Sequence, residues 1–301
     1  MTSIQGQPSK AGGVLQRIVR SVLFRLVVFA VVLVGLFVAL QIGIGMGLRQ
    51  APKGIQPPLF LAAELAYIAV MLLGYRLAVR VLERRPAAEL ALDRTWKLIV
   101  PGLLLGAALF SAVYSILRIQ GVASEATPGG FDGATAALAA ALASAVGEEI
   151  LFRGVAFRLV EEGLGTLAAT VFSAALFGLA HGLNRGATAF STAAIALEAG
   201  VLLGVAYAAT RSLWFPIGLH FGWNFTEGGV FGAAVSGGQA HGMLNFKLTG
   251  SALMTGGAFG PEASIVAVGV CLLAALVLGG VVVVKGEWRS FPYGRRRPSA
   301  A

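Results

Sequence analysis

Long uninterrupted apolar runs recur along this chain and restrict its fold more than any other feature. The run from Leu26 to Leu48 exceeds the ~20 residues that a helix needs to cross a bilayer. Apolar residues make up 57% of the sequence and charged residues only 12%, well below the ~25% of soluble domains. These runs also lack the alternation of a membrane β-barrel. The sequence therefore predicts an all-α, polytopic membrane protein.

The hydropathy pattern predicts about eight transmembrane helices with an intramembrane polar cavity. The expected spans cover Leu26–Leu48, Pro58–Val79, Leu98–Leu117, Thr135–Val160, Leu167–Leu183, Ala187–Ala209, Leu213–Thr226 and Ile265–Val284. Three regions follow. Residues 1–97 contain a polar tail, two spans and a basic loop, residues 98–226 contain the polar motifs below, and residues 227–301 contain a Gly-rich extracytoplasmic segment, the last span and a basic tail.

The distribution of lysine and arginine predicts the orientation. With both termini cytoplasmic, 17 of the 23 Lys and Arg residues fall on the cytoplasmic side and five outside, while Arg153 lies within a span. Membrane proteins concentrate these residues in cytoplasmic loops. We therefore expect a multi-pass plasma-membrane protein with both termini in the cytoplasm. The net charge of +9 then reflects topology and anionic lipid, and no nucleic-acid partner is expected.

Charge appears where it is least expected, inside the fourth apolar run. Placing an ionised group at the centre of a membrane helix costs about 2.5–3.5 kcal/mol on insertion scales. The presence of Glu148, Glu149 and Arg153 in this run therefore indicates a structural or functional role for them. Glu149 and Arg153 are four residues apart and share a helix face, which favours a structural ion pair. Glu148 points about 100° away and has no local partner. We therefore expect Glu149 and Arg153 to support the site and Glu148 to act as a general base.

Two later spans supply further polar residues at helical spacing. Phe177 and His181 lie four residues apart at the end of the fifth span, and His220 and Asn224 lie four apart in the seventh. Each pattern alone favours a capping or interhelical role. Together, Glu148 and His181 could deprotonate a water while His220 and Asn224 stabilise an oxyanion. Flanking glycines would let the helices approach closely, namely Gly178, Gly182, Gly218 and Gly222.

Other protease designs fit the sequence poorly. No His-Glu-x-x-His zinc helix occurs, and no serine has a convincing nucleophile context. Asp132, the only aspartate within reach of a span, lies in a loop, so an aspartyl dyad is excluded. The single cysteine, Cys271, provides neither a disulfide framework nor a cysteine metal site.

The ordered motifs resemble the type II CAAX prenyl endopeptidase family, also called the CPBP group or ABI domain. The resemblance rests on Glu148-Glu149-x-x-x-Arg153, Phe177-x-x-x-His181 and His220-x-x-x-Asn224, with a similar Leu213–Gly218 lead-in, and covers about residues 98–225. It implies an eight-helix, glutamate-type intramembrane protease. Glu148 and His181 would activate water, His220 and Asn224 would form the oxyanion site, and Glu149 with Arg153 would support them.

The resemblance also implies a membrane-associated peptide or protein substrate within the lipid bilayer. Family members are often labelled metalloproteases, but these residue types do not match a typical zinc triad, so the prediction requires no metal cofactor. Eukaryotic relatives cut prenylated tails, whereas other members are associated with bacteriocin maturation, self-immunity or membrane signalling.

Several alternatives stay open at this point. A non-catalytic scaffold or bacteriocin self-immunity protein could keep the motifs for packing, although packing alone needs only the Glu149–Arg153 pair, and a transporter could use Glu148 to bind protons. The repeated spacing at His241 and Asn245 lies in the Gly-rich segment, where no helix aligns it, and is interpreted as coincidence. Glu198 is interpreted as a packing residue that could line the same cavity.

Overall fold

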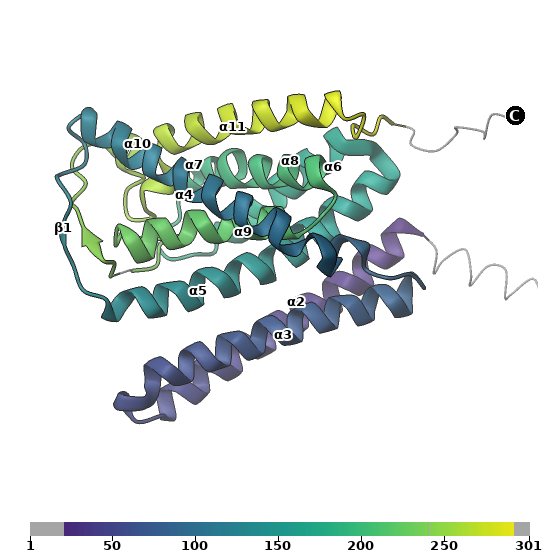
Figure 1. Cartoon of the computed structure of the whole chain (residues 1–301), viewed down its shortest axis with the longest axis horizontal. Coiled ribbons are helices and arrows are strands. Elements are labelled where there is room, and N and C mark those ends of the chain that lie inside the picture. The colour runs from purple at the N-terminus through teal and green to yellow at the C-terminus, as the bar shows by residue number, and fades with distance from the viewer. Residues whose placement is uncertain (1–20, 240, 292–301) are drawn as a thin grey trace, which may run out of the picture.

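The computed structural model describes residues 21–291 except residue 240, and its regular structure is helical apart from one small sheet (Figure 1). The polar tail expected over residues 1–16 and the arginines at 295–297 lie outside the described residues. The longer helices are α2 (Val22–Gln50), α3 (Gln56–Leu82), α4 (Thr95–Ile119), α5 (Asp132–Glu149), α6 (Arg158–His181), α8 (Val201–Thr210), α9 (Trp214–Asn224) and α11 (Ile265–Val284).

Shorter elements connect or extend these helices. Three segments are π-helical and continue a neighbouring helix without a break, namely η4 (Ile150–Phe157), η5 (Ala196–Gly200) and η6 (Phe225–Val230). The remaining short elements are the helices α7 (Ala189–Ile195) and α10 (Ala252–Thr255), the 3₁₀ turns η1 (Lys53–Ile55), η2 (Ala88–Leu90), η3 (Leu92–Arg94) and η7 (Pro261–Ala263), and the strands β1 (Thr127–Pro128) and β2 (Leu244–Asn245).

The prediction of an all-α polytopic membrane protein is confirmed. Within the described residues, six helices are long and apolar enough to cross a membrane, and one of them runs for 49 residues from Gly133 to His181. Gly165 divides that stretch because its positive φ of 83° bends the chain. With this bend and the continuous unit of α9 and η6, the described part of the chain contains eight long helical rods.

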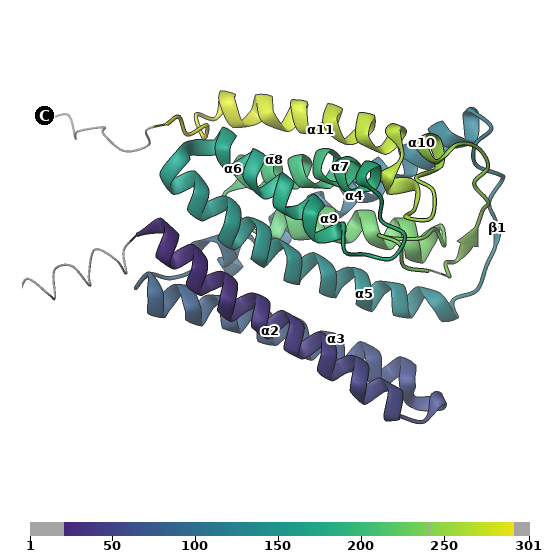
Figure 2. The same ribbon diagram turned by 180° about the vertical axis from the view of Figure 1, so that it is seen from behind.

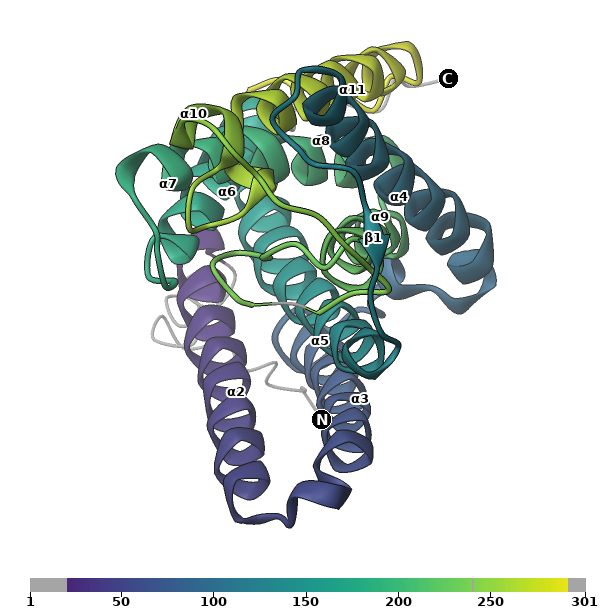
Figure 3. The same ribbon diagram turned by 90° about the vertical axis from the view of Figure 1, so that its left-hand side faces the viewer.

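The rods stack in layers around α6 and α9. Seen from behind, α6 crosses the bundle between α5 and the layer formed by α8 and α11 (Figure 2). The hairpin of α2 and α3 packs along α5, and its tip projects from the bundle at the end where α5 begins (Figures 1 and 3). The fourth expected span is longer than predicted, because the helix runs past Val160 to Gly165. The seventh also continues, through η6 to Val230.

Glycines bring α4 and α9 into backbone contact. A Cβ at Gly106 would meet the carbonyl oxygen of Leu219, and a Cβ at Gly222 would meet that of Leu103. Gly102 and Gly218 repeat this reciprocal arrangement one turn away. Small residues allow such close packing where lipid removes the hydrophobic driving force between helices. α9, which carries His220 and Asn224, is therefore fixed against α4.

One end of the bundle is tied by buried ion pairs. Glu83 at the end of α3 accepts hydrogen bonds from Arg158 at 2.8 and 3.0 Å and pairs with Arg25 at 3.5 Å. Arg85 donates to Glu89 at 2.9 Å. Burial alone would raise the pKa of Glu89, but the hydrogen bond from Arg85 and the charge of Arg158 outweigh burial and hold that pKa below its ordinary value. These pairs join α2, α3 and α6.

The Gly-rich segment expected over residues 227–264 forms a folded cap at the opposite end. β2 pairs antiparallel with β1, with Thr127 opposite Asn245, and Lys247 O accepts from Ser124 N at 2.8 Å. Viewed along the bundle, the segment lies across the ends of α5 and α9 (Figure 3). The loop before α5 and this segment therefore support one another.

Gly106→Ala and Gly222→Ala should each lower the stability of the protein in detergent by about 1–3 kcal/mol, because the added methyl group meets backbone that cannot move aside. Gly269→Ala on α11 is the matched control, since its Cβ would meet nothing within 4 Å. Thermal unfolding measures the difference. Equal unfolding temperatures for all three variants would contradict the proposed close packing.

Candidate active site

Glu148 and Glu149 end α5, and the π-helical segment η4 begins at the next residue. π-Helical turns are rare and occur often at functional sites. Glu149 and Arg153 are both fully buried, and Arg153 Nη1 donates to Glu149 Oε1 at 2.7 Å. Arg153 Nη2 also donates to the carbonyl oxygens of Ala199 and Gly200, each at 3.1 Å. The expected ion pair is therefore present, and it links η4 to the segment that follows Glu198.

Glu149 also contacts His220, which the sequence did not predict. His220 Nδ1 lies 3.1 Å from Glu149 Oε1, the same oxygen that accepts from Arg153. A carboxylate accepts hydrogen bonds, so this contact places a proton on Nδ1 and turns Nε2 toward the cavity. Glu149 therefore orients the His220 ring in addition to pairing with Arg153.

His181 is the last residue of α6, as predicted, and its orientation is set by the preceding turn. Its Nδ1 lies 2.9 Å from the carbonyl oxygen of Phe177. Because a carbonyl can only accept, Nδ1 carries the proton and Nε2 is free to act as a base. The ring stacks on Phe177 with centroids 4.4 Å apart. Nε2 then faces Glu148 Oε2 at 3.6 Å.

Glu148 lies between the two histidines. Its Oε2 is 3.6 Å from His181 Nε2 and 4.0 Å from His220 Nε2, and it has no hydrogen-bond partner. Asn224, one turn beyond His220, donates to Ser144 Oγ at 3.3 Å. The four polar residues expected at the site therefore come together from α5, α6 and α9.

Phe177 provides the apolar floor beneath these groups. The Arg153 guanidinium lies 4.7 Å from its ring centroid, and the His220 ring meets it edge-on with centroids 6.1 Å apart. An aromatic face attracts a cation and also fixes flat neighbours. The phenylalanine of the Phe177-x-x-x-His181 pattern therefore positions both histidines.

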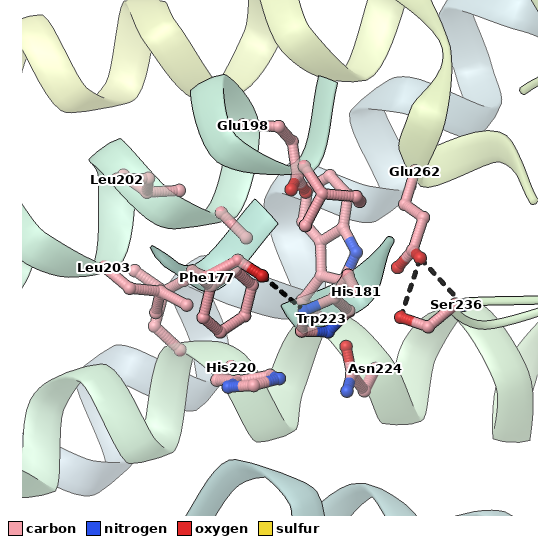
Figure 4. A pocket seen from close by; sticks show the side chains of 13 residues that line it. Phe177, His181, Glu198, Leu202, Leu203, His220, Trp223, Asn224, Ser236 and Glu262 are labelled. Atoms are coloured by element: carbon pink, nitrogen blue, oxygen red, sulfur yellow. Dashed lines mark hydrogen bonds between the residues drawn. The ribbon is translucent and has the colours of Figure 1, made fainter. Parts of the chain in front are cut away.

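Two cavities adjoin the polar cluster. The smaller one has a volume of about 20 Å³ and is lined by both histidines, Asn224, Glu198 and Glu262 (Figure 4). A water needs roughly 10–15 Å³ by the same measure, so one water fits there. The larger cavity has a volume of about 440 Å³ and reaches Glu148, His181 and Asn224 from the end where α5 begins.

Glu198 was predicted to be a packing residue that could line the cavity, and it has one oxygen near a sulfur atom and one without a partner. It lines the smaller cavity, and its Oε1 lies 3.8 Å from the sulfur of Cys271. Its Oε2 has no hydrogen-bond partner.

The second His-x-x-x-Asn pattern, at His241 and Asn245, does not form one site. His241 lines the larger cavity, whereas Asn245 belongs to β2 and is absent from the wall of that cavity.

Two residues near the cluster lie outside every predicted motif. Tyr67 of α3 places its buried hydroxyl against Gly147, where any side chain would collide with it, and the hydroxyl has no partner. Glu262 of η7 accepts from the backbone N–H of Ser236 at 2.7 Å and faces the smaller cavity (Figure 4). Burial raises the pKa of Glu262, and the hydrogen bonds from Ser236 oppose this shift only in part. For Tyr67, the sequence signal was Gly147, a residue without a side chain next to two carboxylates in an apolar run, which leaves room for a group from another helix.

The fold and the cluster define a polytopic helical membrane protein with a polar site inside the bundle. Residues 130–226 match the family model described as Type II CAAX prenyl endopeptidase Rce1-like, which confirms the predicted assignment to the CPBP family. The match covers less than half of the chain and contains all seven residues named in the three motifs. Over these residues the chain is similar to CAAX-protease-like membrane proteins. Neither the search of curated proteins nor that of solved structures finds a match.

The ligand set for a catalytic metal does not form in the described part of the chain. No three His, Cys, Asp or Glu side chains there are placed so that they could hold a metal ion. Glu148 is near both histidines, but its closest approach to either is 3.6 Å, and His220 Nδ1 is engaged by Glu149. The metal implied by the metalloprotease label of the family therefore does not fit these residues.

Arg153→Met should destabilise the protein by about 3–5 kcal/mol, because it leaves the fully buried Glu149 without its guanidinium partner. Unfolding of the purified protein in detergent measures this loss. Arg118→Met, at the exposed end of α4, is the control and should change the stability by less than about 0.5 kcal/mol. Similar stabilities for the two variants would show that the pair contributes little.

Proposed function

We propose that this protein is an intramembrane endopeptidase that hydrolyses a peptide bond with a water activated by Glu148 and His181. The observation that carries the proposal is the approach of the Glu148 carboxylate to both histidines, next to a cavity of about 440 Å³ that Glu148, His181 and Asn224 line. Family membership supports protease activity in general.

The water would be held by groups that otherwise lack partners. Glu148 Oε2 is buried without a hydrogen bond, and His181 Nε2 is an acceptor that faces it at 3.6 Å. Buried polar atoms without partners are rare and often mark a bound water. Glu148 would take a proton from this water as the oxygen attacks the substrate carbonyl, and would then deliver it to the nitrogen of the leaving amine.

The opposite side of the carbonyl would meet two hydrogen-bond donors. His220 Nε2 carries a proton when the ring is cationic, a state that the Glu149 carboxylate favours through Nδ1. Asn224 Nδ2 would exchange its bond to Ser144 for one to the oxyanion. Each such donor accelerates comparable reactions about 10²–10³-fold. Glu149 and Arg153 act as positioning residues in this mechanism.

The orientation and location of the protein are part of the proposal. Among the described Lys and Arg residues, eleven lie toward the end where α11 finishes and five toward the end where α5 begins, while Arg153 lies between. This asymmetry supports cytoplasmic termini in a plasma membrane. The partners would be a membrane-associated peptide or protein and the bilayer, and nucleic acid has no role.

Glu148→Gln and His181→Ala should each lower kcat by about 10²–10⁴-fold, because each removes a group that accepts a proton or holds the water. The measurement is cleavage of internally quenched peptides by the full chain in detergent. Glu64→Gln is the matched control, since Glu64 is an intramembrane carboxylate bonded to Gln41 and lies outside both cavity walls. Unchanged cleavage by Glu148→Gln would refute the mechanism, and a biological effect without hydrolysis would favour the scaffold alternative.

A further inference from the structure

The larger cavity follows one face of α5 and ends at Glu148. Ala136, Ala140, Ser144 and Glu148 all line it and are spaced by four residues, so they form one stripe along the helix. The stripe is about 18 Å long at 1.5 Å per residue. An extended chain of about five residues has this length at ~3.4 Å per residue. The cavity is therefore a groove with the dimensions of a short extended peptide.

The facing wall comes from two parts of the chain that carry no motif. Phe60 of α3 lies on one side, and the cap contributes Gly238, Gln239 and His241 on the other. The cap is held down on α5, because a Cβ at Gly133 would meet the backbone and Cβ of His241. The mouth of the groove is therefore formed by folded structure, at the end where α5 begins.

The chemistry of the wall suits a peptide backbone without charge. Three side-chain amides line the groove, from Asn184, Asn224 and Gln239, and each can both donate and accept as a peptide unit requires. Among the described lining residues there is no Lys or Arg, and Glu148 is the only carboxylate. A free C-terminal carboxylate would find no Lys or Arg among the described lining residues and would be repelled by Glu148. The groove thus favours an internal, uncharged stretch.

The side of access follows from the charges at the two ends. The mouth lies at the end with five of the described Lys and Arg residues, opposite the end with eleven. Building on the protease function proposed above, we propose that the substrate is an internal, uncharged, extended segment of a membrane-anchored polypeptide, which reaches Glu148 from the extracytoplasmic side along the alanine stripe of α5.

Cysteine labelling tests the side of access without any activity. Cys271, the only cysteine, is fully buried, so the wild type gives a low background. Ala140→Cys should react with a membrane-impermeant maleimide in right-side-out vesicles, together with Lys53→Cys at the same end. Lys97→Cys, at the start of α4, should react only in inverted vesicles. Labelling of Ala140→Cys in inverted vesicles alone, or in neither preparation, would overturn the proposal.

A second measurement tests what occupies the groove. Ala140→Leu should raise KM at least fivefold for uncharged peptides with large side chains and less for glycine- and alanine-rich ones, because the added isobutyl group narrows the groove. Thr135→Leu is the matched control, since Thr135 is exposed on α5 but absent from the wall. Equal KM values for the two variants would exclude this groove as the substrate path. If the wild type cleaves no peptide, the proposed function fails while the labelling result still reports access.

Discussion

The buried carboxylate of Glu149 is the group on which the rest of the structure depends. One of its oxygens accepts from Arg153 of η4 and contacts Nδ1 of His220 on α9, while Arg153 also binds carbonyls at the end of η5. Three helical rods are thereby joined through groups that could not remain in an apolar interior alone. The same bond sets the His220 ring, so Nε2 points at Glu148. Stability and chemistry thus share one hydrogen-bonded cluster.

The parts of this cluster that the sequence predicted are those within single helices. Spacing by four residues fixes a shared face wherever a helix is continuous, which is why Phe177 with His181 and Glu149 with Arg153 have the expected contacts. The predicted close approach of a neighbouring helix at Gly218 and Gly222 is also confirmed, because a Cβ at either position would meet the backbone of α4. The apolar runs also predicted the eight long helical rods of the described residues, of which Gly133–His181 counts as one span and α9 with η6 as none by length and hydropathy.

The parts that could not be predicted depend on contacts between distant segments. The approach of Glu149 to His220 joins residues 71 apart, and nothing in either local pattern specifies the partner. The π-helical segments after Glu149 and Asn224 shift the following residues without a sequence signal. Tyr67 and Phe60 reach the site from α3, a helix without any motif, because the packing of α3 on α5 places them there. Such packing is not readable from periodicity.

The small residues of α5 have opposite consequences at different points along the helix before Glu148. At Gly147 the missing side chain is replaced by the Tyr67 hydroxyl, so that position is filled. Along Ala136, Ala140 and Ser144, no neighbour takes up the space, and a groove remains. Packing alone favours larger side chains at these positions, since unfilled volume forfeits dispersion contacts. The fold fills the turn at Gly147 and leaves the three preceding turns open. This pattern is better explained by the proposed entry of a peptide chain to Glu148 than by the packing of the bundle.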